Sequence, residues 1–118
     1  MGNNHEELLQ EWQKRLGLLD WKIKLKDNCT PDDMAVEDSN GDVSFLEASK
    51  VARIDMMDEK FYGDRILPFD WEKTLVHELM HLKLSLLDNS GSDLQDRLLH
   101  QIIDDMAKAL VDAKRSTQ

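Results

Sequence analysis

The chain contains at residues 74–82 the segment Thr74-Leu75-Val76-His77-Glu78-Leu79-Met80-His81-Leu82. Apolar residues occupy most positions around its histidines, which is typical of a buried helix. We predict a helix over residues 71–87 that begins at Asp70, whose carboxylate can accept hydrogen bonds from the free amides of the first turn. Burying two imidazoles and a carboxylate is costly unless these groups have partners. The segment therefore predicts an inner helix that carries a polar site.

A second helix is expected downstream. Asn89 and Gly91 interrupt the first helical pattern, and Ser92 with Gln95 forms a capping-box pair at the next start. A broad apolar stripe follows, made of Leu94, Leu98, Leu99, Ile102, Ile103, Met106, Ala109 and Leu110. The remaining residues, 111–118, are expected to form either a frayed tail or a plug for a cleft.

Upstream of the segment we expect one helix and a group of strands. Residues 5–17 have helical spacing and end at Gly17, and residues 21–26 alternate between apolar side chains and lysines, as in a half-buried strand. Further strands are predicted at 43–48 and 50–57, between loops at 27–42 and 58–69, with at most a short strand at 34–37 and a turn at 40–42. Strands grouped between helices predict an α+β fold with a small, mostly antiparallel sheet, in a single domain over residues 1–118.

The composition restricts the class of protein. The chain has 118 residues, and its 15 basic and 24 acidic residues give a net charge of −9. Such an acidic domain matches the phosphate backbone poorly, so we expect no nucleic-acid partner. No apolar stretch approaches the ~20 residues that cross a bilayer, so no membrane partner is expected either. Cys29 is the only cysteine, and with no secretory leader in sight we expect a cytoplasmic protein.

The histidines and the glutamate of the segment suggest metal chemistry. Residues four apart lie one above the other on a helix, so His77 and His81 can bind one metal ion. Glu78 would project beside that ion without being a ligand. It could accept the proton of a metal-bound water as the water attacks a carbonyl carbon.

Residues 74–83 resemble the extended signature of the zincin metallopeptidases, although Lys83 stands where that family usually has an apolar residue. The order of elements is similar to that of the smallest members, the minigluzincin-like metallopeptidases of bacteria, archaea and phages. This resemblance implies a minimal zincin-like domain, with an N-terminal helix, a small sheet, the motif helix and a C-terminal helix. It also implies a catalytic Zn²⁺ and a third ligand from the last helix.

The third ligand is predicted to be His100. The gluzincin resemblance implies a glutamate in the last helix, but no glutamate follows Glu78, and His100 stands at the corresponding place. Eighteen residues separate it from His81, which suffices to finish one helix and return with a second. If His100 is instead a surface residue, Asp96 or Asp104 is the next candidate. Otherwise these two aspartates would orient the ligating imidazole.

Other residues received alternative interpretations. Tyr62 or Arg65 is a candidate to stabilise an oxyanion, and the alternative for Tyr62 is that it only packs its loop. The strand at 50–57 is expected either to border the cleft and pair with substrate, or to be an ordinary sheet edge. The three tryptophans are expected to anchor the core, and His5 to face solvent without a role.

These observations predict a zinc-dependent metallopeptidase acting on a peptide or protein substrate. His77, His81 and His100 would hold the zinc, and Glu78 would be the general base. Two alternatives stay open. One is a regulatory metallodomain that binds or cleaves a single partner protein such as a repressor. The other is a metal-free helical interaction module.

Overall fold

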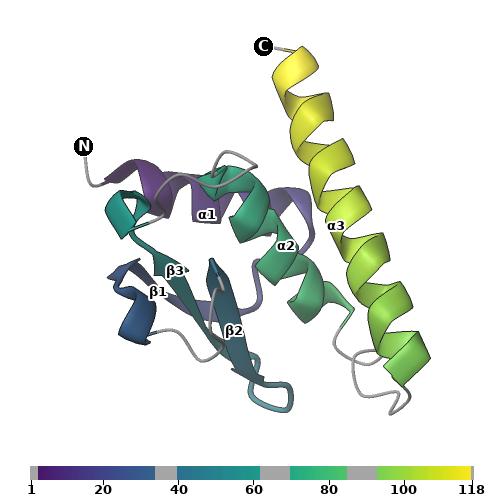
Figure 1. The fold of residues 1–118 in the computed structure, drawn as a ribbon, viewed down its shortest axis with the longest axis horizontal. Helices are drawn as coiled ribbons and strands as arrows, with labels where there is room; N and C mark the ends of the chain where they lie inside the picture. The colour runs from purple at the N-terminus through teal and green to yellow at the C-terminus, as the bar shows by residue number, and fades with distance from the viewer. Residues whose placement is uncertain (1–2, 34–39, 62–69, 85–92, 118) are drawn as a thin grey trace.

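The computed structural model describes residues 3–33, 40–61, 70–84 and 93–117. Within these ranges the chain forms, in order, α1 (Asn3–Arg15), β1 (Lys22–Cys29), η1 (Pro31–Asp33), β2 (Gly41–Leu46), β3 (Val51–Met57), η2 (Glu59–Phe61), α2 (Trp71–Lys83) and α3 (Asp93–Ser116) (Figure 1). The predicted α+β class is confirmed. None of the helices in the described part of the chain is long and apolar enough to cross a bilayer.

The three strands form one mixed sheet in the order β1-β3-β2. β1 runs parallel to β3, with Ile23 opposite Ala52, whereas β2 runs antiparallel to β3, with Val43 opposite Ile54. The sheet is therefore not mostly antiparallel as predicted. Because β3 pairs on both sides, both interpretations of residues 50–57, as a cleft-bordering strand and as a sheet edge, were wrong. Of the two outer strands, β2 is the one that lies against α2.

Several element boundaries differ from the predicted ones. Helix α1 starts at Asn3 and ends at Arg15, and Gly17 (φ +71°) forms the turn after it. Residues 27–29 belong to β1 rather than to a loop, and residues 41 and 42 begin β2 rather than a turn. Helix α2 ends at Lys83. The rest of its predicted range, the short strand at 34–37 and the Ser92 cap lie outside the described residues.

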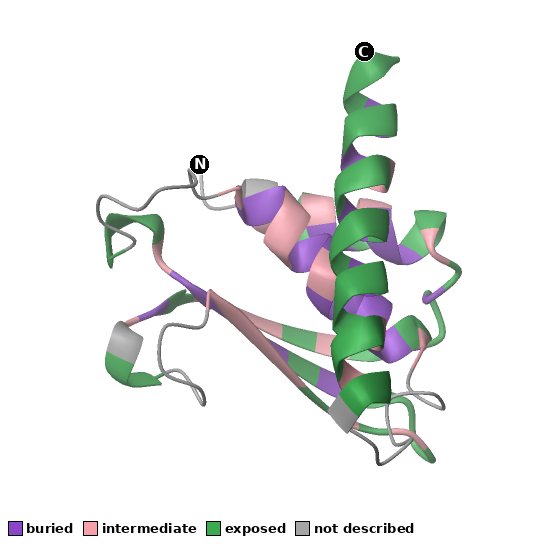
Figure 2. Ribbon diagram, turned by 45° about the vertical axis from the view of Figure 1, so that its right-hand side comes forward, coloured by how far each residue is buried: buried purple, intermediate pink, exposed green. Residues whose placement is uncertain are grey.

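The core lies between the inner face of the sheet and the helices. Ile54 of β3 and Leu75 and Leu79 of α2 are fully buried, and the three tryptophans are at most 8% exposed, as predicted. Lys22 and Lys24 on the other face of the sheet are exposed and Lys26 is partly exposed, which fits the predicted half-buried strand. Figure 2 shows α3 standing along the helical layer with most of its surface exposed.

Helix α3 runs antiparallel to α2 and contacts it along most of the length of α2. Four successive side-chain contacts, here called rungs, join the helices: His81 with His100, His77 with Asp104, Lys73 with Asp112, and Asp70 with Arg115. Both expectations for residues 111–118 were therefore wrong as far as Ser116, because the helix continues and Val111 is fully buried. The rungs place one end of α3 at the histidines and the other at the start of α2.

A buried ion network joins α1, α2 and α3 where the C-terminal end of α3 meets the start of α2. Glu72 Oε2 accepts hydrogen bonds from Trp12 Nε1 (2.7 Å) and from Lys114 Nζ (2.5 Å), and Glu72 Oε1 accepts one from Arg115 (3.2 Å). Burial alone would raise the pKa of Glu72 and lower that of Lys114. Burial is the largest single influence on each pKa, but the partners together outweigh it: Lys114, Trp12 and Arg115 lower the pKa of Glu72, and Glu72 and Glu11 raise that of Lys114. Both side chains are therefore charged at neutral pH.

His5 does not face solvent freely as predicted. Its ring stacks on Trp71 with the centroids 3.8 Å apart, and its Nδ1 lies 2.8 Å from Asp27 Oδ2. Neither contact could be read from the sequence, because the partners lie 66 and 22 positions away. The contacts tie the start of α1 to β1 and to the start of α2.

Candidate metal centre

Helix α2 positions the first two histidines. Asp70 caps it as predicted, accepting a hydrogen bond from the amide of Lys73 at 3.1 Å. The apolar residues of α2 are buried in the core, so the remaining side of the helix is turned toward α3. His77 and His81 lie on this side one turn apart, and His81 is only 7% exposed. The fold thus holds two imidazoles where they cannot move far.

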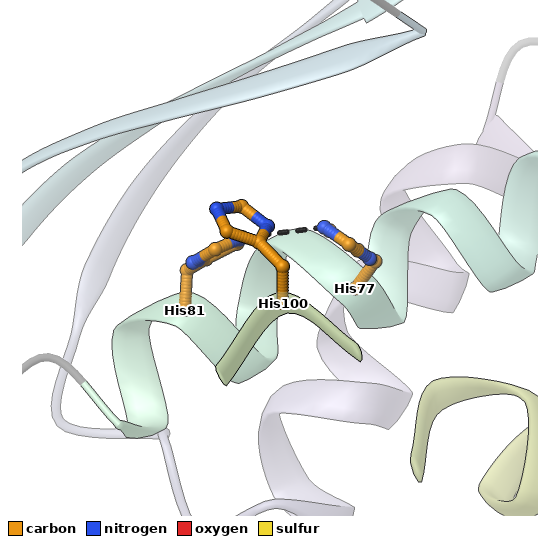
Figure 3. Close-up of side chains that lie close together, drawn as sticks. All are labelled: His77, His81 and His100. Atoms are coloured by element: carbon orange, nitrogen blue, oxygen red, sulfur yellow. Dashed lines mark hydrogen bonds between the residues drawn. The ribbon is translucent and has the colours of Figure 1, made fainter. Parts of the chain in front are cut away.

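The two imidazoles point toward each other (Figure 3). Their Nε2 atoms lie 3.2 Å apart. Two nitrogens that bind one tetrahedral zinc ion at about 2.0–2.1 Å are ~3.3 Å apart. This part of the site therefore already has the spacing of a ligand pair.

His100 comes to the same place from α3 (Figure 3). Its ring centroid lies 4.8 Å from that of His81 and 6.1 Å from that of His77. One nitrogen of each ring falls within 4.8 Å of the others, and among the described residues this group contains neither Asp96 nor Asp104. His100 is exposed, so its side chain can rotate to close the remaining distance. The three histidines can hold a metal ion.

Asp104 contacts His77 rather than His100, the imidazole it was expected to orient. His77 Nδ1 lies 2.5 Å from Asp104 Oδ1. A carboxylate can only accept a hydrogen bond, so the proton of the neutral ring sits on Nδ1. The lone pair of Nε2 then faces the other histidines, which is the tautomer that a metal requires.

The electrostatic surroundings of His77 also favour its metal-binding form. Burial lowers the pKa of His77 below the usual imidazole value, and this effect outweighs the opposing attraction of Asp104. His81 and His100 lower the pKa of His77 further. At neutral pH the ring is therefore uncharged and able to bind a cation.

Glu78 lies beside the histidines in a pocket of about 570 Å³. It is 7% exposed, and Gly41 at the start of β2 lies close to it. A Cβ atom at Gly41 would come within 3.0 Å of Met56 Sδ and Thr74 Cγ2 and 3.4 Å of Glu78 Cγ, so a larger residue would require these side chains to shift. The pocket gives a small molecule or peptide access to the carboxylate next to the possible ion.

The remaining residues to place are the oxyanion candidates and the pocket-lining residues that were not predicted. Tyr62 and Arg65, the candidates for an oxyanion role, lie outside the described residues. Lys108, Thr74 and Gly41 also line the pocket, which was not predicted from the sequence. The sequence spacing could have indicated Lys108, because it stands one helical turn after Asp104 and two after His100. No sequence pattern indicates Gly41, since its neighbour α2 lies some 30 residues away in the chain.

Replacing Asp104 by asparagine is expected to weaken zinc affinity about 10–100-fold, because a neutral amide, which can also turn its NH₂ group toward the ring, replaces the charged acceptor that fixes the His77 tautomer. The dissociation constant can be measured by competition with a zinc-binding dye. Asp105→Asn is the matched control, since this exposed neighbour carries the same charge. Equal affinities for the two variants would contradict the orienting role.

No family model, curated protein or solved structure matches this chain.

Proposed function

We propose that this chain is a zinc-dependent metallopeptidase of the zincin type, which hydrolyses peptide bonds with Glu78 as general base. The observation that carries the proposal is the meeting of His77, His81 and His100 at one point, from two helices that the fold holds side by side. The HExxH spacing of residues 77–81 supports it independently.

The residues present fit a zinc ion. Three imidazoles and an open fourth position are the donor set of a catalytic zinc site, and nitrogen ligands suit zinc among the common divalent cations. The 3.2 Å spacing of the first two nitrogens and the carboxylate on His77 agree with this choice. When bound, zinc polarises a carbonyl oxygen and lowers the pKa of a water ligand toward ~7.

The protein residues divide the remaining work. Glu78 accepts a proton from the attacking water and returns it to the leaving amine. Asp104 keeps His77 in one orientation. Thr74 and Gly41 lie close to each other beside Glu78 and line the same pocket.

The direct test is metal analysis of the protein purified without chelator. We expect about one zinc ion per chain in the wild type, and loss of stoichiometric zinc in His100→Ala, because two imidazoles do not complete a catalytic site. His5→Ala is the matched control, since His5 is the only other histidine of the chain and lies outside the cluster.

Two outcomes would contradict the proposal. One is wild-type protein that takes up zinc no better than His100→Ala. The other is zinc-loaded protein that cleaves no bond in a protein digest sampling many sequences. An unchanged thermal midpoint after treatment with EDTA would favour the metal-free module instead, because a filled site adds binding energy to the folded state.

A second candidate, the regulator of a single partner protein, is favoured by one observation. Helix α3 exposes four apolar side chains spaced four residues apart, Leu94, Leu98, Ile102 and Met106, each at least 43% exposed. Such a row is suited to bind a partner. Zinc-loaded protein that fails on digests yet cleaves or binds one protein would support this candidate.

A further inference from the structure

One face of α3 carries three polar side chains at successive turns. His100 is the proposed third ligand, Asp104 contacts His77, and Lys108 comes one turn later. Side chains four apart in a helix lie on the same side. Lys108 therefore stands on the face that turns toward α2, two turns away from the metal centre.

Lys108 lines the same pocket as Glu78. This pocket lies between the start of β2, the first half of α2 and the middle of α3. It has a volume of about 570 Å³, enough for several side chains of a bound peptide. Its lining residues are Asn40, Gly41, Asp70, Lys73, Thr74, His77, Glu78, Asp104, Ala107 and Lys108. Of the three histidines His77 lines the pocket, together with Glu78, and Lys73 and Lys108 lie one turn further from the metal centre on α2 and α3.

Most charges of this pocket are already neutralised by neighbours. Asp70 accepts two hydrogen bonds from Arg115, at 2.8 and 3.0 Å, and Lys73 lies 3.4 Å from Asp112. Lys108 is different, because it forms no ion pair or hydrogen bond with any residue that the structure describes. The far end of the pocket thus presents an ammonium group that a bound ligand can neutralise.

We propose that Lys108 is a carboxylate-binding subsite, so that the preferred substrates carry a negative charge near the cleaved bond. This inference rests on the proposed peptidase function. The eight residues from His100 to Lys108 span about 12 Å of helix. An extended peptide covers this length with about three residues. The carboxylate belongs either to an acidic side chain at this distance or to the C-terminus of the substrate, and lysines at the far end disfavour a basic residue there.

The test uses probes without peptide direction, namely linear hydroxamates that end in a carboxylate, with chains of four to twelve carbons. Their terminal amides serve as the neutral counterparts. The hydroxamate group binds zinc, and the dissociation constant is measured by calorimetry on the zinc-loaded chain. We expect the carboxylate series to bind more tightly than the amides, with an optimum at an intermediate chain length.

Variants assign the preference to one residue. We expect Lys108→Ala to weaken binding of the best carboxylate probe about fivefold, the upper range for an exposed ion pair, and to leave its amide unaffected. Lys108→Glu should bind the amide better than the carboxylate. Lys24→Glu makes the same charge change on the open face of the sheet and should alter neither. Lys108 is exposed, so these substitutions are compatible with folding.

The outcomes separate the two proposals. If no hydroxamate binds to the zinc-loaded chain, the bound zinc offers no open position and the proposed peptidase function is refuted. If carboxylates and amides bind equally, or if Lys24→Glu acts like Lys108→Glu, only the subsite is refuted. If the subsite is supported, cleavage of a protein digest identifies the natural carboxylate. Cuts near internal Asp or Glu indicate an acidic side chain, and cuts near peptide ends indicate the C-terminus.

Discussion

Replacing Glu78 by glutamine should lower kcat for peptide hydrolysis about 10²–10⁴-fold, the usual contribution of a positioned general base. Glutamine has nearly the same shape, so it fits the space between β2 and α2 that Gly41 leaves open. It cannot accept a proton, however, so the attacking water is not activated. The rate is measured on any peptide that the wild type cleaves.

The zinc content of the same variant distinguishes a catalytic effect from a structural one. Glu78 is not a proposed ligand, so we expect Glu78→Gln to keep the wild-type zinc stoichiometry. Glu59→Gln, in the exposed η2 turn, is the matched control and should retain full activity. A fully active Glu78→Gln would refute the base, and a variant without zinc would show that Glu78 supports the site itself.

Replacing Lys114 by methionine is expected to lower the free energy of unfolding by about 3 kcal/mol. Its ammonium group is buried between Glu72 and Glu11, at 2.5 and 3.1 Å. Removing it leaves the carboxylate of Glu72 buried with fewer partners. We expect the lower end of the range for a broken buried ion pair, because Arg115 still reaches the other oxygen of Glu72.

Urea unfolding of the wild type and the variant gives this difference. Lys108→Met, on the same helix but exposed, should change the free energy of unfolding by less than about 0.5 kcal/mol. The double variant with Glu72→Gln should be less destabilised than the sum of the single variants, because the two residues act as a pair. Additive effects would mean that the ion pair does not stabilise the fold.

The parts of the fold that depend on local sequence were predictable. Asp70 and the apolar spacing after it define the start of α2 within a few residues, and the cap is present as expected. The meeting of His100 with His77 and His81 was also predictable, because His100 stands where the family resemblance implies a third ligand and the connection is long enough for an antiparallel return. These features need only short-range patterns, chain length and that resemblance.

The remaining features depend on contacts between distant segments. Alternation in residues 51–57 shows which side chains face the core, but it does not show that β3 lies between a parallel and an antiparallel neighbour. Glu72 and Lys114 look like ordinary surface charges in the sequence, yet they are 8% and 9% exposed. Their burial depends on Trp12, which lies 60 residues before Glu72. No local pattern signals such an arrangement.

The two ends of α3 are attached in different ways. Residues 111–115 are held by the core and the ion network, whereas none of the side chains of residues 94–100 is buried. A cation bound by His77, His81 and His100 would therefore attach the beginning of α3 to α2. In such an arrangement the ordering of these first turns depends on metal supply, so a metal-starved cell would contain a protein that lacks its chemistry and has a loosened helix.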